Sequence, residues 1–385
     1  MDITQKMSTT QSNEKSSWLD RPIADVLPRM TLENILALVI ILLAIVSRFY
    51  GVGWRSMSHD EVNHVVPAFD LYEGRGYRHD PITHGPLQFH LLALSYFLFG
   101  DNDTAARIPA AVFSVATVAF VLFGFRRYLG RSGALLAGLF FLISPYLLFY
   151  GRYTRNEAFV ALFGVMMIYA TLRYLERGDH FSLYLLAAAL SLQFITKETS
   201  YIYTAQLLLF LGILFLIRMD QAQWKTLTSR RYAIGLTISA LGLFVLGLGM
   251  AIWDASTNKS SGAVEGAEAA AMSPTSIAAI VMVIVGLILG GLLLLHIIRS
   301  LGWKRVRSER SFDLLLLVGT LILPQLAAFP IKMIGTLLGQ VWNPTDYAST
   351  AGMIRIVVTL VVLFMASAAI GIWWKPRPWP VSYTH

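Results

Sequence analysis

The stretch SHDEVNHVVPAFDLYEGRGYRHDPITHGPL, residues 58–87, is the part of the sequence around which the rest is organised. It is dense in carboxylates, histidines and arginines, and it directly follows a first long apolar segment. Most of the remaining chain is hydrocarbon. Single charged groups at a bilayer surface are common, but a cluster of carboxylates, histidines and arginines fixed between membrane spans indicates a functional site.

The composition indicates the fold class. The chain has 385 residues, of which 56% are hydrophobic and only 14% are charged, against about a quarter in soluble proteins. The apolar residues come in runs of roughly twenty, the length of a helix that crosses a bilayer. The sequence therefore predicts an all-α polytopic membrane protein.

Three further features restrict the possible partners, covalent links and targeting of the protein. The net charge of +8 is explained by basic cytoplasmic loops and does not indicate a nucleic-acid partner. The chain has no cysteine, so disulfides are excluded. Residues 1–31 are polar and have no apolar core, which predicts a flexible cytoplasmic tail and no signal peptide.

The short apolar segment 87–100 decides the topology. It is too short to cross comfortably and suits a helix lying in the interface. If it does not cross, every strongly basic connection falls on the cytoplasmic side. We therefore predict about ten spans, with both chain ends inside and interfacial helices in the first external loop, residues 51–105. The predicted spans are 32–49, 106–124, 132–149, 157–172, 182–196, 200–217, 233–252, 276–298, 313–329 and 353–374.

The chemistry is concentrated in the first half. Four separated stretches reach the outer surface in this topology: Asp60-Glu61, the turn from His79 to Pro86 that contains His84, residues 152–157 and Lys197-Glu198. Any one of them alone fits interfacial side chains that reach toward water. Together they predict a catalytic module over residues 32–217. Residues 218–385 supply further membrane helices to which we assign no role.

These residue types suit transfer of a group from a lipid phosphate. A carboxylate at the membrane surface can take the proton of an acceptor hydroxyl group as general base. Arginine and lysine can offset the charge on a departing phosphate. Asp60 and Glu157 could instead share a divalent metal that performs this neutralisation. An apolar body offers grooves for a polyprenyl tail.

The order of the motifs resembles the GT-C superfamily of membrane glycosyltransferases, particularly the protein O-mannosyltransferase and lipid A aminoarabinose transferase branch. Asp60-Glu61 resembles the acidic pair that follows the first span of that family. His84-Gly-Pro-Leu87 resembles its His- or Lys-Pro-Pro-Leu element, followed by Phe99-Gly100 and Ala106-Arg107-Ile-Pro109. The stretch from Arg152 to Glu157 resembles the Arg-x-x-x-x-Asp stretch, and Lys197 resembles a later lysine. Gly85 and Glu157 depart from the pattern, since the family has proline and aspartate there.

The resemblance implies a membrane glycosyltransferase that uses a polyprenyl-phosphate sugar and inverts the anomeric centre. It implies a site on the external face of the plasma (inner) membrane and a protein, lipid or glycan acceptor. Its predicted catalytic residues are Asp60, Glu61 and Glu157. Its predicted ligands of the lipid phosphate are His84, Arg152, Arg155 and Lys197.

Other functions are less well matched by the sequence. Asp60-Glu-Val-Asn-His64 is close to a zinc-peptidase motif, but His59 and His64 are five residues apart and point about 140° apart on a helix. A transporter or a flippase-associated protein would usually show mid-membrane polar groups and repeated halves. A scaffold without activity is the remaining alternative.

Overall fold

The computed structural model describes residues 31–77, 84–258, 273–338, 340 and 342–374, and within these parts it contains helices and no strand. The predicted tail therefore lies outside the described residues except for Thr31, and the turn at His79–Pro81 lies outside them entirely. The helices are α2 (Leu32–Phe49), α3 (His59–Tyr72), α4 (Leu87–Phe99), α5 (Asp103–Gly124), α6 (Arg126–Ile143), α7 (Pro145–Tyr150), α8 (Glu157–Arg177), α9 (His180–Phe194), α10 (Ser200–Asp220), α11 (Leu227–Asn258), α12 (Pro274–Leu301), α13 (Trp303–Arg307), α14 (Arg310–Ile322), the 3₁₀ helix η3 (Leu323–Leu326), α15 (Ala328–Leu337) and α16 (Thr350–Trp374).

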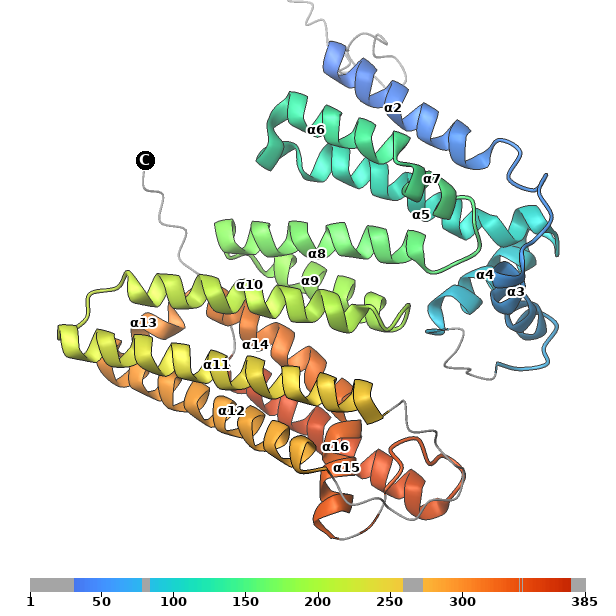
Figure 1. The fold of residues 1–385 in the computed structure, drawn as a ribbon. Coiled ribbons are helices and arrows are strands. Elements are labelled where there is room, and N and C mark those ends of the chain that lie inside the picture. The colour runs from blue at the N-terminus through green and yellow to red at the C-terminus, as the bar shows by residue number, and fades with distance from the viewer. Residues whose placement is uncertain (1–30, 78–83, 259–272, 339, 341, 375–385) are drawn as a thin grey trace, which may run out of the picture.

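The long helices run up and down in one bundle, and the short helices α3, α4 and α7 gather at one end of it (Figure 1). Seven described helices are long and apolar enough to cross a membrane, and a pair bent by 52°, Arg310–Leu326 with Ala328–Gly335, makes an eighth. The protein is thus an all-α polytopic membrane protein. The two other predicted spans fall on α6, which contains three arginines, and on α9, which has 15 residues.

Two features of the predicted spans need correction. The span expected over 132–149 ends at Ile143, because Pro145 begins a new short helix, α7, whose first turn is capped by the Ser144 side chain. The span expected over 313–329 is broken between η3 and α15. Prolines lie at or near both breaks: Pro145 begins α7, and Pro324 and Pro330 lie on either side of the second break. Proline lacks the N–H group that a continuing helix needs.

Helix α4 does not cross the bundle. Its 13 residues span about 20 Å, against about 30 Å for a bilayer core. Phe89, Leu92 and Tyr96 on α4 are buried against Ala68 of α3 and Ala105 of α5. The pair α3 and α4 therefore forms a helical layer at the membrane end, as the sequence predicts for the first external loop.

A proline inside α5 is compensated by a neighbouring side chain. Pro109 has no N–H group to donate to the carbonyl of Ala105. The hydroxyl group of Ser95 on α4 donates to that carbonyl instead, at 2.6 Å. This bond fixes α4 against the start of α5, next to the residues that hold the site.

The C-terminal helices pack directly on the first half. One hydrophobic core joins α8, α9 and α10 to Leu314 and Val318 of α14. At the far end of the bundle, the Asp313 carboxylate accepts hydrogen bonds from Tyr174 of α8 and from Trp374 of α16. The helices after residue 217 thus brace the predicted catalytic module.

Candidate active site

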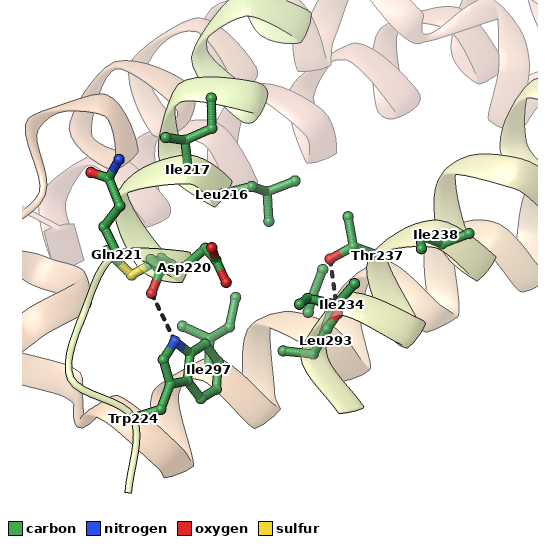
Figure 2. A pocket seen from close by; sticks show the side chains of 12 residues that line it. Leu216, Ile217, Asp220, Gln221, Trp224, Ile234, Thr237, Ile238, Leu293 and Ile297 are labelled. Atoms are coloured by element: carbon green, nitrogen blue, oxygen red, sulfur yellow. Dashed lines mark hydrogen bonds between the residues drawn. The ribbon is translucent and has the colours of Figure 1, made fainter. Parts of the chain in front are cut away.

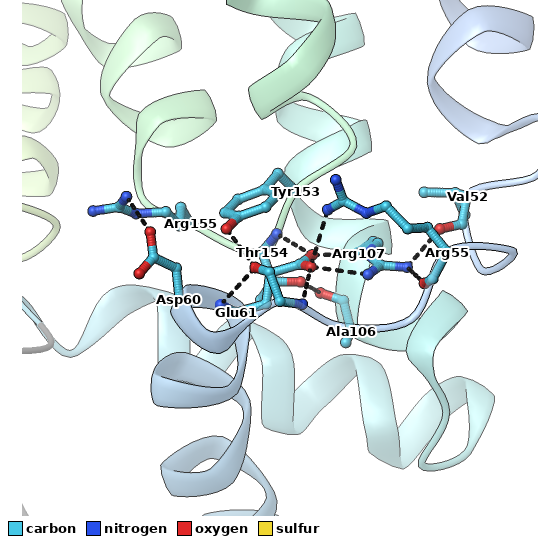
Figure 3. A network of polar contacts seen from close by, with 10 residues as sticks. Val52, Arg55, Asp60, Glu61, Ala106, Arg107, Tyr153, Thr154 and Arg155 are labelled. Atoms are coloured by element: carbon cyan, nitrogen blue, oxygen red, sulfur yellow. Dashed lines mark hydrogen bonds and ion pairs between the residues drawn. The ribbon is translucent and has the colours of Figure 1, made fainter.

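A buried ion pair organises the first external loop. Arg107 of α5 donates to both carboxylate oxygens of Glu61, with Nε–Oε1 at 2.8 Å and Nη2–Oε2 at 2.9 Å. Neither side chain is exposed by more than 1%. The backbone N–H groups of Ser58 and Thr154 and the side chain of Arg55 also donate to this carboxylate (Figure 3).

These bonds decide the charge of Glu61. Burial opposes ionisation, but the hydrogen bonds from Arg107 and from the two backbone N–H groups outweigh it, so the pKa of Glu61 is lowered. Glu61 also forms a capping box with Ser58 at the start of α3. Its oxygens are occupied by the protein itself, which fits a residue that joins α3, α5 and the 152–156 loop.

Asp60, the neighbouring carboxylate, points in a different direction. Its side chain is 55% exposed, and Arg155 Nη1 lies 3.1 Å from its Oδ2 atom. Arg155 Nε also lies 3.7 Å from Glu157 Oε2, and Lys197 Nζ lies 2.6 Å from Glu157 Oε1. Alternating charges therefore run from Asp60 through Arg155 and Glu157 to Lys197, and they come from three separate segments of the chain.

Several atoms along this row have no hydrogen-bond partner. They are buried and include Nε of Arg155, Oε2 of Glu157 and Nδ1 of His64. Unbonded buried polar atoms are rare and costly in folded proteins. Arg155 Nε and Glu157 Oε2 face each other at 3.7 Å, beyond hydrogen-bond distance, so a polar ligand placed here would meet groups that lack a hydrogen bond.

The loop at His84 is fixed against the loop at Lys197 by backbone hydrogen bonds. The Gly85 N–H group donates to the Thr196 carbonyl and the Leu87 N–H group donates to the Ile195 carbonyl, both at 3.1 Å. A Cβ atom on Gly85 would lie 2.2 Å from the Ile195 oxygen. Proline at this position would lose the first bond and clash, which explains why glycine departs from the motif here.

His84 is thereby brought into the site. Its Nδ1 atom lies 2.6 Å from Glu198 Oε2, and its ring stacks on that of His64 with centroids 6.2 Å apart. Burial lowers the pKa of His64 to about 4, helped by the charges of Arg155 and His84 and opposed by Glu157. The sequence places Glu198 in one of the four predicted external stretches, but it predicts no role in the site for Glu198 or His64.

Arg152 is not joined to this row by any contact. Its Nη1 atom donates to the Ser47 carbonyl of α2 at 2.6 Å. Nearby, Arg48 is fully buried and donates to Ser114 and to the carbonyls of Phe141 and Leu142 at the end of α6. The four predicted phosphate ligands thus have different surroundings. Arg155 and Lys197 belong to the row, and the His84 ring stacks on His64, which lies beside the row. Arg152 contacts α2 instead.

The residues as arranged do not fit a metal shared by Asp60 and Glu157. The Arg155 guanidinium pairs with both carboxylates and occupies the place that a cation would take. No group of three or more histidine, aspartate or glutamate side chains in the described parts of the chain is placed to hold a metal ion. The hypothesis of a zinc peptidase has no support in the structure either. His59 is exposed and His64 is buried, so the two rings of α3 do not face one metal position.

A cavity of about 270 Å³ lies between α10, α11 and α12 and contains none of the predicted site residues. Figure 2 shows its mainly aliphatic lining, with Asp220 and Trp224 at one side. The Asp220 carboxylate is held in a two-bond ion pair by Arg230. This cavity therefore offers apolar volume but no group free for catalysis.

A comparison with known proteins finds a family match for part of the chain. Residues 83–250 match the family model described as dolichyl-phosphate-mannose-protein mannosyltransferase. The match covers His84, Arg155, Glu157 and Lys197, and it begins after the Asp60-Glu61 pair. No curated protein matches the chain in a sequence search. The chain is thus a helical membrane protein that, over less than half of its length, is similar to this family of membrane glycosyltransferases.

Proposed function

We propose that this protein transfers a sugar from a polyprenyl-phosphate donor to an acceptor hydroxyl group at the external face of the plasma (inner) membrane. The observation that carries the proposal is the row Asp60–Arg155–Glu157–Lys197, which sets an exposed carboxylate beside two cations. The name of the matched family refers to a lipid-phosphate mannose donor and a protein acceptor. For this chain we propose a hydroxyl group of a protein, lipid or glycan as acceptor.

In this mechanism Asp60 acts as general base. It takes the proton from the acceptor hydroxyl group while the acceptor oxygen forms a bond to the anomeric carbon. The bond between that carbon and the phosphate oxygen breaks, and its electron pair stays on the phosphate. Attack on the side opposite the departing phosphate inverts the anomeric centre. Asp60 is the exposed carboxylate of the row, so an acceptor can reach it from the aqueous side.

Arg155 and Lys197 offset the charge that collects on the departing phosphate. Positioned cations in a site that excludes water stabilise such a charge far more than they would in bulk water. Glu157 holds both cations in place before the donor arrives. We assign Glu61 a positioning role, because its carboxylate is buried and bonded on both oxygens.

Replacement of the base tests the proposal. Asp60→Asn keeps the shape of the side chain but removes its affinity for a proton, so transfer of a radiolabelled sugar from a polyprenyl-phosphate donor should fall by about 10²–10⁴-fold while donor binding is retained. Asp70→Asn is the matched control, because Asp70 is an ion-paired carboxylate on the same helix without contact to the row. Transfer by Asp60→Asn at the wild-type rate would refute the assignment.

The same assay tests the predicted divalent metal. The mechanism above uses no metal, so incubation of the purified protein with a chelator should leave the transfer rate unchanged. A rate that is lost with the chelator and restored by a divalent cation would support the metal prediction and would require Arg155 to move. Movement of the intact lipid donor without any sugar transfer would instead favour a flippase.

A further inference from the structure

We infer that Glu198 is a positioning residue for His84 and holds this imidazole ready to bind the phosphate of the lipid donor. The inference rests on the proposed function and extends it to a residue without an assigned role. It is based on the contact between the two side chains, on the backbone conformation at His84 and on the free nitrogen of the ring.

The backbone at His84 needs external support. Its φ angle is +70°, and it is the only residue other than glycine with a positive φ in the parts of the chain that the structure describes. A side chain at positive φ is strained, and such strain persists only where the surroundings impose it. The two backbone bonds to the 195–196 segment and the Glu198 carboxylate supply this restraint.

The contact with Glu198 also fixes the orientation of the ring. Nδ1 of His84 lies 2.6 Å from Glu198 Oε2, which leaves Nε2 without a hydrogen bond in the described structure. The His84 side chain is 22% exposed, so Nε2 can be reached by a ligand. The stacked His64 ring supports the other side of the imidazole.

The balance of charges in the site explains why a phosphate would need His84 in this orientation. Asp60, Glu157 and Glu198 provide three carboxylates, whereas Arg155 and Lys197 provide two permanent cations. A phosphate anion would meet an excess of negative charge unless a further cation joined the site. A doubly protonated His84 would supply this cation, since its Nδ1–H group would donate to Glu198 and its Nε2–H group to the phosphate.

The test is a double-mutant cycle on donor affinity. Glu198→Ala should raise the KM for the polyprenyl-phosphate sugar about ten-fold and change kcat less than two-fold. His84→Ala should also raise KM, and addition of Glu198→Ala to it should cause less than a two-fold further change, because the two residues act as one unit. Glu73→Ala is the matched control, an exposed carboxylate of the same external segment that pairs with Arg75.

The outcomes separate this inference from the proposed function. Two results would overturn the inference while sugar transfer by the wild type stands. One is that the two replacements affect KM independently. The other is that Glu198→Ala lowers KM, because it removes a negative charge.

The cycle is repeated with binding of polyprenyl monophosphate alone, measured as the shift in melting temperature. Coupling in that assay without sugar transfer by the wild type would support the inference and refute the transferase. A melting temperature of the ligand-free Glu198→Ala protein that falls by several degrees, with the KM for the donor unchanged, would show a purely structural role and also overturn the inference.

Discussion

The amino group of Lys197 lies 2.6 Å from Glu157 Oε1, although 40 residues separate them in the chain. Lys197 follows α9 and Glu157 opens α8, so the pair closes the site at the ends of two neighbouring helices. Both side chains are nearly buried, with exposures of 15% and 11%. At such depth each charge needs the other, because an unpaired buried charge is strongly destabilising.

Replacement of Lys197 should therefore lower both donor affinity and rate. In Lys197→Met the carboxylate of Glu157 retains only the longer contact to Arg155. We expect kcat/KM to fall roughly 10²-fold, equivalent to about 2.7 kcal/mol, with contributions from KM and kcat. Steady-state transfer kinetics measure both. Lys225→Met, an exposed lysine between α10 and α11, is the control. A change in KM alone would limit Lys197 to binding.

Replacement of Glu61 should act on stability. Glu61→Gln leaves the buried Arg107 guanidinium without its counterion, and loss of one partner of a buried pair costs about 3–5 kcal/mol. We expect a markedly lower melting temperature in detergent, whereas Asp60→Asn at the exposed neighbour should melt close to the wild type. If Glu61→Gln kept wild-type stability and lost only activity, Glu61 would be a catalytic residue and not a positioning one.

Acid should destabilise the protein through His64. The pKa of His64 is lowered to about 4 in the fold from an ordinary value of 6.5, so the unfolded chain binds more protons between these values. Stability should therefore fall as the pH decreases from about 6.5 to about 4, by about 3 kcal/mol in total, and this contribution should level off below pH 4. Melting temperature as a function of pH measures the effect.

Two variants isolate that contribution. His64→Gln should lack this part of the acid sensitivity, since the groups that face His64, namely Arg155, His84, Glu157 and Lys197, remain in place. His59→Gln on the exposed face of the same helix should keep it. Parallel pH profiles of the wild type and His64→Gln would show that His64 is not the group responsible.

Single cysteines can test the orientation, because the chain has no cysteine of its own. Asn63 on α3 and Gln223 between α10 and α11 are both exposed. We expect Asn63→Cys to react with a membrane-impermeant thiol reagent added outside intact cells, and Gln223→Cys to react only after permeabilisation. The reverse pattern would place the candidate site on the cytoplasmic face.

Much of the fold follows from the sequence by itself, because length and hydropathy of a segment are local properties. Runs of about twenty apolar residues require helices in a bilayer, where each backbone group must be bonded within its own segment. The distribution of arginine and lysine then favours one arrangement of the loops. The spacing of Ser58 and Glu61 also carries a capping-box signal, which indicates a structural use of Glu61.

Only the tertiary structure decides which charged groups meet. Asp60 and Glu61 are neighbours in the chain, yet α3 turns one toward the aqueous side and buries the other against Arg107. Arg152 and Arg155 lie in one loop and still have separate partners, the Ser47 carbonyl and the Asp60 carboxylate. Side-chain direction depends on helix phase and on partners from distant segments. Composition and motif order contain neither, so the sequence predicts a candidate region and the fold determines which partners each charged residue in it has.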